Sequence, residues 1–121
     1  MKKFILLIED NDPIRENTAE LLELADYEVL ATNRGKNGLR MLSERAPDLI
    51  LCDIAMPEMD GYEFLKVVRE DYGLTSTPFI FFTAFSEKSD IQKGLQLGAT
   101  DFVVKPFEPD DLISLIDKYV G

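Results

Sequence analysis

The sequence of 121 residues contains no histidine and no tryptophan, and it has a single cysteine. Without histidine the chain cannot build a Ser–His–Asp triad, a histidine metal site or an internal phosphohistidine. Cys52 cannot form an internal disulfide, and because it lies within an apolar run we expect a small buried side chain rather than a reactive thiol. The chemistry open to the chain is therefore that of carboxylates, hydroxyls and amines.

The sequence also lacks a long hydrophobic run. The apolar stretch 4–8 follows two lysines but stops at Glu9, which makes it too short for a signal peptide or a membrane span. We therefore expect a cytoplasmic protein without membrane contact. Basic residues are few: the sequence has 13 Lys and Arg and 23 Asp and Glu, which gives a net charge of −10. A surface of this sign repels nucleic acid, so direct binding of nucleic acid is not expected.

The length fits one domain, residues 1–121, in which five apolar segments alternate with five segments of helical periodicity. The pattern predicts strands at 3–8, 28–31, 48–53, 79–83 and 101–105, and helices at 13–25, 35–45, 62–70, 87–97 and 109–119. Asp12 is expected as the N-cap of the first helix, before Pro13. This alternation predicts an α/β fold, a five-stranded doubly wound parallel sheet with helices on both faces.

Polar side chains stand at the ends of four of these predicted strands. Glu9 and Asp10 follow the first strand, Asp53 ends the third, and Thr83 and Lys105 end the fourth and fifth. In a parallel sheet all of these ends meet at one edge. Three carboxylates so close together require a cation, and oxygen ligands with room for water select Mg²⁺ over Zn²⁺. The sequence therefore predicts a divalent metal site at this edge.

Lys105 adds a positive charge to the predicted site and Thr83 adds a hydroxyl, a pair that suits the oxygens of a phosphoryl group. Asp53 between them is positioned as a carboxylate nucleophile. Taken by itself, Asp53 is more typical of a residue that caps the turn after its strand. The convergence of the other side chains favours the nucleophile.

Four segments, ILLIEDND, DLILCDIAMPEMDG, FFTA and GATDFVVKPF, together resemble a response regulator receiver domain of the chemotaxis-regulator type over essentially the whole chain. The resemblance implies the flavodoxin-like strand order 2-1-3-4-5. It also implies phosphoryl transfer from a histidine kinase or phosphotransfer protein to Asp53, with Mg²⁺ or alternatively Mn²⁺ as cofactor. The metal ligands that the resemblance implies are Glu9, Asp10, Asp53 and the backbone carbonyl of Ala55. The side chains that would bind the phosphoryl group are Thr83 and Lys105. The supporting positions are Pro57, Gly61, Ala84 and Pro106.

The same resemblance implies a switch. Phe102 corresponds to an aromatic ring that turns inward when the Thr83 hydroxyl engages the phosphoryl group, which changes the surface formed by the helix at 87–97, the strand at 101–105 and the last helix. The alternative is that Phe102 only packs its strand. Lys105-Pro106 resembles a dipeptide that is cis in the family, and the trans state stays open.

Two positions depart from polar choices that are frequent in the family. Ala55 and Phe85 lie two residues beyond Asp53 and Thr83, beside the route by which water would reach a phospho-aspartate. Neither side chain can orient that water by a hydrogen bond. We therefore expect slow self-dephosphorylation.

Two other functions stay open. A magnesium-dependent aspartyl phosphohydrolase is disfavoured because Ala55 stands where its second acid is needed, and a receiver-like binding module that takes no phosphate is disfavoured because the five polar side chains are all present. The expected partners are a histidine kinase docked near Ile14 and Arg15 and a downstream protein or effector domain. A second copy at the switch surface stays open as an alternative partner.

Overall fold

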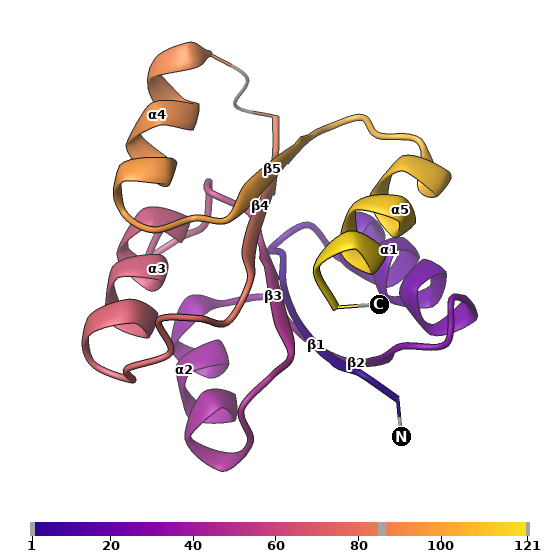
Figure 1. Ribbon diagram of the computed structural model, residues 1–121, viewed down its shortest axis with the longest axis horizontal. Helices are drawn as coiled ribbons and strands as arrows, with labels where there is room; N and C mark the ends of the chain where they lie inside the picture. Colours follow the sequence, from indigo (N-terminus) through magenta and orange to yellow (C-terminus); the bar gives the residue numbers. More distant parts are fainter. Residues whose placement is uncertain (1, 85–86, 121) are drawn as a thin grey trace.

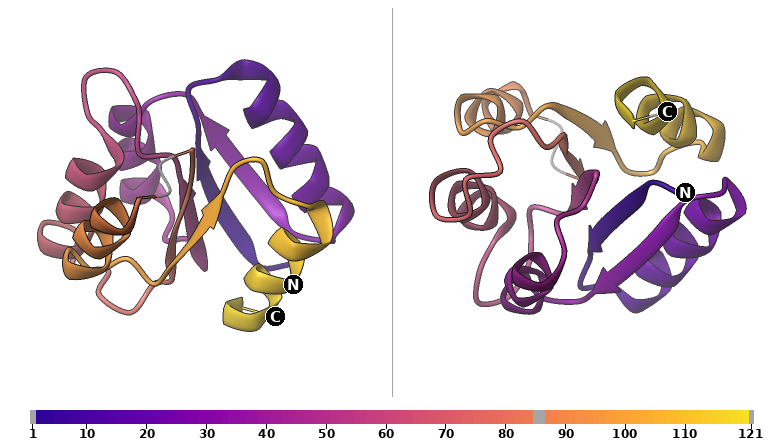
Figure 2. Two further views of the ribbon diagram at one scale, coloured as in Figure 1. Left: turned by 90° about the horizontal axis from the view of Figure 1, so that it is seen from above. Right: turned by 60° about the horizontal axis from the view of Figure 1, so that its bottom comes forward.

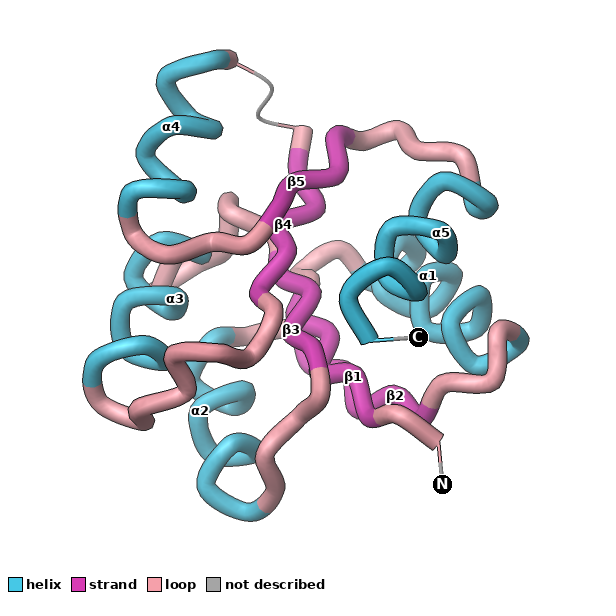
Figure 3. The backbone as a smooth tube through the Cα atoms, viewed as in Figure 1, coloured by secondary structure: helices cyan, strands magenta, loops and turns pink. Residues whose placement is uncertain are grey.

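The computed structural model describes residues 2–84 and 87–120. Its five parallel strands form one sheet in the order β2-β1-β3-β4-β5, which confirms the predicted doubly wound, flavodoxin-like fold (Figure 3). The strands are β1 (Phe4–Ile8), β2 (Glu28–Thr32), β3 (Leu49–Cys52), β4 (Phe79–Thr83) and β5 (Asp101–Val104). The helices are α1 (Asp12–Leu24), α2 (Gly35–Glu44), α3 (Gly61–Glu70), α4 (Lys88–Gln96) and α5 (Pro109–Val120).

Helices cover both faces of the sheet, with α2, α3 and α4 on one side and α1 and α5 on the other (Figures 1 and 2). The strands β1, β3 and β4 are buried on both faces, which explains why their sequences are continuous apolar runs rather than alternating ones. Successive side chains enter opposite cores: Leu6 packs toward α2 and α3, and Leu7 toward α1 and α5. Cys52 is buried as expected, and burial raises the pKa of its thiol.

The starts of two helices are fixed by side-chain caps. The prediction of Asp12 as the N-cap of α1 is wrong, because the Asn11 Oδ1 accepts the hydrogen bond from the Ile14 N–H, at 2.9 Å, and Asp12 already lies in the first turn. At α3, Asp60 and Glu63 form a reciprocal capping box. This box begins the helix directly after the loop that follows β3.

The register of the parallel strands brings the polar residues that follow them to one edge of the sheet. Ile8 pairs with Cys52, and Thr83 pairs with Val104, so the residues that come next in each chain segment share one edge. The Asp53 N–H donates to the Ile8 carbonyl at 3.0 Å, and the Lys105 N–H to the Thr83 carbonyl at 2.8 Å. Among the residues described, no helix combines the length and apolar character needed to cross a membrane.

Candidate functional site

The three predicted carboxylates come together at the carboxyl edge of the sheet. Glu9, Asp10 and Asp53 each offer an oxygen, and these oxygens all lie within 4.8 Å of one another. Glu9 is fully buried, Asp53 is 7% exposed and Asp10 is exposed. The cluster therefore opens to solvent on the side of Asp10. A set of carboxylate oxygens, reachable from one side, fits the ligand preference of Mg²⁺.

Lys105 enters this cluster from the end of β5. Its Nζ contacts the Glu9 Oε1 and lies 3.2 Å from the Asp53 Oδ2. The same Nζ lies 4.7 Å above the centre of the Phe82 ring. The peptide bond between Lys105 and Pro106 is cis, the state that the sequence had left open. The ammonium of this partly buried lysine thus contacts two acids that follow β1 and β3.

Among the three acids of the cluster, Glu9 has a pKa that departs clearly from its ordinary value. Its pKa is raised from 4.5 to about 7, mainly by burial and also by the neighbouring Asp53, while Lys105 acts in the opposite direction. A carboxyl in this state becomes fully ionised at neutral pH only when more positive charge is near. The electrostatics of the cluster therefore favour the arrival of a cation.

Asp53 is held by backbone on two sides. Its Oδ1 accepts a hydrogen bond of 2.7 Å from the Ile54 N–H. The Gly61 N–H donates to the Ile54 carbonyl at 2.8 Å, and a Cβ at Gly61 would lie 2.4 Å from the Asp53 carbonyl oxygen. Only glycine permits this approach, so the supporting position predicted at Gly61 closes the loop onto the acid.

The two residues predicted to carry the switch lie on β4 and β5. Thr83 is fully buried at the end of β4. The Phe102 ring lies 5.3 Å from the Phe81 ring, and a Cβ at Gly94 of α4 would lie 2.6 Å from its Cζ. The ring therefore packs against α4, as the strand-packing alternative expects, and its role in a switch stays a prediction. Phe85 lies outside the residues that the structure describes.

A cleft of about 600 Å³ leads to the acidic cluster. Among the residues that line it are Asp10, Ala55 and Pro57, which were expected near the site, and Tyr62 and Lys93, which were not. The Tyr62 hydroxyl donates to the Asp90 carbonyl at 3.2 Å, and the Lys93 Nζ lies 4.3 Å above the Tyr62 ring. Tyr62 has a helical spacing typical of core residues, and its partners lie 28 or more positions away. No local pattern reveals this connection between α3 and α4.

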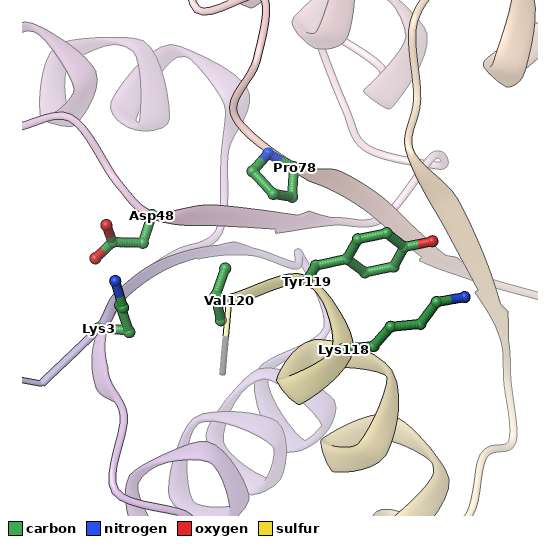
Figure 4. A pocket seen from close by; sticks show the side chains of 6 residues that line it. All are labelled: Lys3, Asp48, Pro78, Lys118, Tyr119 and Val120. Carbon is green, nitrogen blue, oxygen red and sulfur yellow. The ribbon is translucent and has the colours of Figure 1, made fainter.

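Several hollows lie apart from this cleft, and two of them either border the predicted site or are shown in Figure 4. One, of about 610 Å³, runs between α1 and the end of β5 and includes Ala84 and Pro106. The other lies near the amino ends of β1 and β3 (Figure 4). Two of its polar side chains have partners, since Asp48 accepts the Phe4 N–H at 2.7 Å and Tyr119 donates to Asp101 at 2.6 Å. It carries no cluster comparable to that around Asp53.

Comparisons with known proteins agree with this geometry. A family model described as the response regulator receiver domain matches residues 5–117. The chain is 35% identical over 121 residues to the polar-differentiation response regulator DivK of Brucella anthropi, covering 100% of this chain and 98% of DivK. It is 37% identical over 119 residues to the transcriptional regulatory protein CrdR of Helicobacter pylori, covering 98% of this chain but only 55% of CrdR, so it spans about half the length of that relative. The chemotaxis protein CheY4 of Vibrio cholerae superposes with a TM-score of 0.93 at 31% identity, covering 98% of this chain and 99% of CheY4.

Proposed function

The chain belongs to the response regulator receiver domain family, and we propose that it accepts a phosphoryl group on Asp53 from the phosphohistidine of a histidine kinase or phosphotransfer protein. The observation that carries this proposal is the position of Asp53 within a group of acids, 3.2 Å from the Lys105 ammonium. Receiver domains are signalling switches rather than enzymes that turn over a substrate. The proposed reaction is therefore a single transfer that changes the protein itself.

In this reaction an oxygen of the Asp53 carboxylate attacks phosphorus. A P–O bond forms as the P–N bond to the donor imidazole breaks, and the bonding pair leaves with the imidazole nitrogen. The Ile54 N–H keeps the carboxylate oriented during the approach. The Lys105 ammonium is proposed to pair with one oxygen of the transferred group, and the Thr83 hydroxyl is proposed to bind another.

Glu9, Asp10, Asp53 and the backbone carbonyl of Ala55 are the groups proposed to hold Mg²⁺, or Mn²⁺ in its place. The fit rests on the close approach of three carboxylates and on the raised pKa of Glu9. Bound there, the ion would supply positive charge for the phosphoryl oxygens. Asp10, exposed at the mouth of the cleft, is the proposed ligand most open to solvent.

The output is proposed to be a two-state change at the surface of α4, β5 and α5, biased by new contacts at Thr83 and Lys105. In this proposal the packing of the Phe102 ring on α4 would differ between the two states. A downstream protein, an effector domain or a second copy could bind the altered surface. The extent of the domain, 1–121, and the cytoplasmic location stay predictions.

Mass measurement before and after treatment with acetyl phosphate tests the proposal. We expect the mass of one phosphoryl group to be added in the presence of Mg²⁺, not after chelation, and not in Asp53→Ala. Failure of the protein both to gain this mass and to bind beryllofluoride with Mg²⁺ would support a binding module that takes no phosphate. Steady release of phosphate from a small phosphate ester would instead support the phosphohydrolase.

A further inference from the structure

The helices α1 and α5 cover one face of the sheet (Figure 1). A hollow of about 510 Å³ lies between the end of α1 and the first turns of α5. The side chains that line this α1–α5 groove are Leu21, Leu24, Ala25, Asp110, Ile113 and Ser114. Leu21, Ala25 and Ile113 also pack on the core beneath. The floor of the groove is therefore apolar and belongs to the rigid part of the fold.

Leu24 stands at the edge of this groove and is 80% exposed, more than any other exposed large hydrophobic side chain among the residues described. Leu95 on α4, the next in order, is 48% exposed. A single exposed leucine is ordinary, but one beside an apolar hollow can bury its surface only against another molecule.

Acidic residues outnumber basic ones on the two helices that form the groove, and Asp110 lines the groove itself. The helices α1 and α5 together carry seven carboxylates and two cations, namely Asp12, Glu16, Glu20, Glu23, Asp110, Asp111 and Asp117 against Arg15 and Lys118. Arg15 is occupied at the start of α1, where it donates to the Glu9 carbonyl and to Asp12. Within the described ranges 2–84 and 87–120, no ion pair within 4.0 Å engages Glu20, Glu23 or Asp110.

We propose that the α1–α5 groove docks a basic amphipathic helix of a partner protein. A helix that lays an apolar stripe into a groove between two helices would cover Leu24, and lysines or arginines beside that stripe would meet the unpaired carboxylates. A second copy of this chain would bring the same acids to the contact and be repelled. Nucleic acids and anionic lipid surfaces carry the wrong charge in the same way.

This groove is separate from the acidic cluster. None of its lining residues belongs to the groups proposed to hold the metal or the phosphoryl group. Docking therefore requires neither the metal nor the phosphoryl group. The proposal also does not depend on phosphorylation of Asp53, so each can fail without the other.

Fluorescence anisotropy with a labelled helical peptide of leucine and lysine, about 15 residues long, tests the proposal. The control peptide has the same composition in scrambled order, without an apolar stripe. We expect Leu24→Asp to weaken binding of the amphipathic peptide by about tenfold, because an apolar contact is lost. The matched variant Leu95→Asp, which carries the same change on the opposite face, should bind as the unchanged protein does.

The direction in which Leu24→Asp changes the peptide affinity distinguishes apolar docking from charge attraction alone. Leu24→Asp adds a negative charge, so tighter or equal binding of the peptide would overturn the proposal. Equal affinity for the scrambled peptide, or a loss of binding in Leu95→Asp alone, would also overturn it. Sedimentation of the protein without peptide should show a monomer. A dimer that is lost in Leu24→Asp would identify a second copy as the occupant and overturn the proposal. Circular dichroism and urea unfolding establish that Leu24→Asp is folded.

Discussion

Lys105 and Asp53 lie 52 residues apart in the sequence, yet the ammonium nitrogen of one lies 3.2 Å from a carboxylate oxygen of the other. The same nitrogen contacts the buried Glu9. The Lys105 ammonium therefore offsets the repulsion between the buried carboxylates of Glu9 and Asp53. Its removal should affect stability as well as chemistry.

Lys105→Met is expected to lower the free energy of unfolding of the metal-free protein by about 2 kcal/mol at a pH above the pKa of Glu9, because two buried carboxylates lose their cation. Added Mg²⁺ should restore part of the loss. Urea unfolding with and without Mg²⁺ measures both effects. Lys118→Met, at an exposed lysine of α5, serves as the control, and equal stability of the two variants would show that the Lys105 pairing contributes nothing.

The pKa of Glu9 predicts a pH dependence of stability. A carboxyl whose pKa is raised by folding binds its proton more tightly in the folded state, so its contribution to stability is greatest at low pH and is lost as pH rises from 4.5 through about 7. In the metal-free protein this loss should reach at most about 1.4 kcal/mol per pH unit. Urea unfolding across this window measures the slope, and Glu9→Gln should flatten it. A slope that persists in Glu9→Gln would assign the titration to another group.

Gly94 provides the space that the Phe102 ring occupies. A Cβ there would lie 2.6 Å from the Phe102 Cζ and 3.1 Å from the Phe81 Cε2. Gly94→Ala should therefore destabilise the protein by about 1–2 kcal/mol, although alanine favours the helix by up to about 1 kcal/mol. In a Phe102→Leu background the same change should be neutral or stabilising. Urea unfolding of the four proteins forms a double-mutant cycle, and strictly additive effects would contradict the steric explanation.

The lifetime of the phosphorylated protein should depend on Ala55. This residue is exposed in the cleft and offers no side-chain hydrogen bond to water. The double variant Ala55→Asn, Phe85→Glu should shorten the lifetime at least about tenfold, because polar side chains can orient the attacking water. Loss of the phosphoryl mass over time measures it. Ala55→Val is the control for size, and an unshortened lifetime in the double variant would contradict the expectation.

The position of Glu9, Asp53 and Lys105 could be predicted because the topology decides it. Parallel strands joined by helices must end at one edge, so a polar residue after an apolar run is placed by counting strands. The N-cap of α1 could not be decided in the same way. Asn11 and Asp12 are both good caps, and only the path of the chain after β1 determines which side chain meets the Ile14 N–H.

Contacts between helices were beyond prediction from the sequence. Gly94 lies within a helical pattern that gives no sign of a neighbouring ring, and Tyr62 meets Asp90 and Lys93 because α3 and α4 lie side by side. Such contacts depend on the exact separation of the helices, which periodicity does not specify. They are also the contacts through which the surface of α4 is joined to the interior.

The close approach of Gly61 to the Asp53 carbonyl restricts how the gene can be altered. The segment between the two residues is tied at both ends, by β3 on one side and by the capping box of α3 on the other. Its length is therefore set by geometry, and an epitope tag or a reporter domain inserted there would separate Gly61 from Asp53. A biosensor built on this protein should carry its insertion at Gly73 instead, where the chain is exposed and a Cβ would meet no atom within 4 Å.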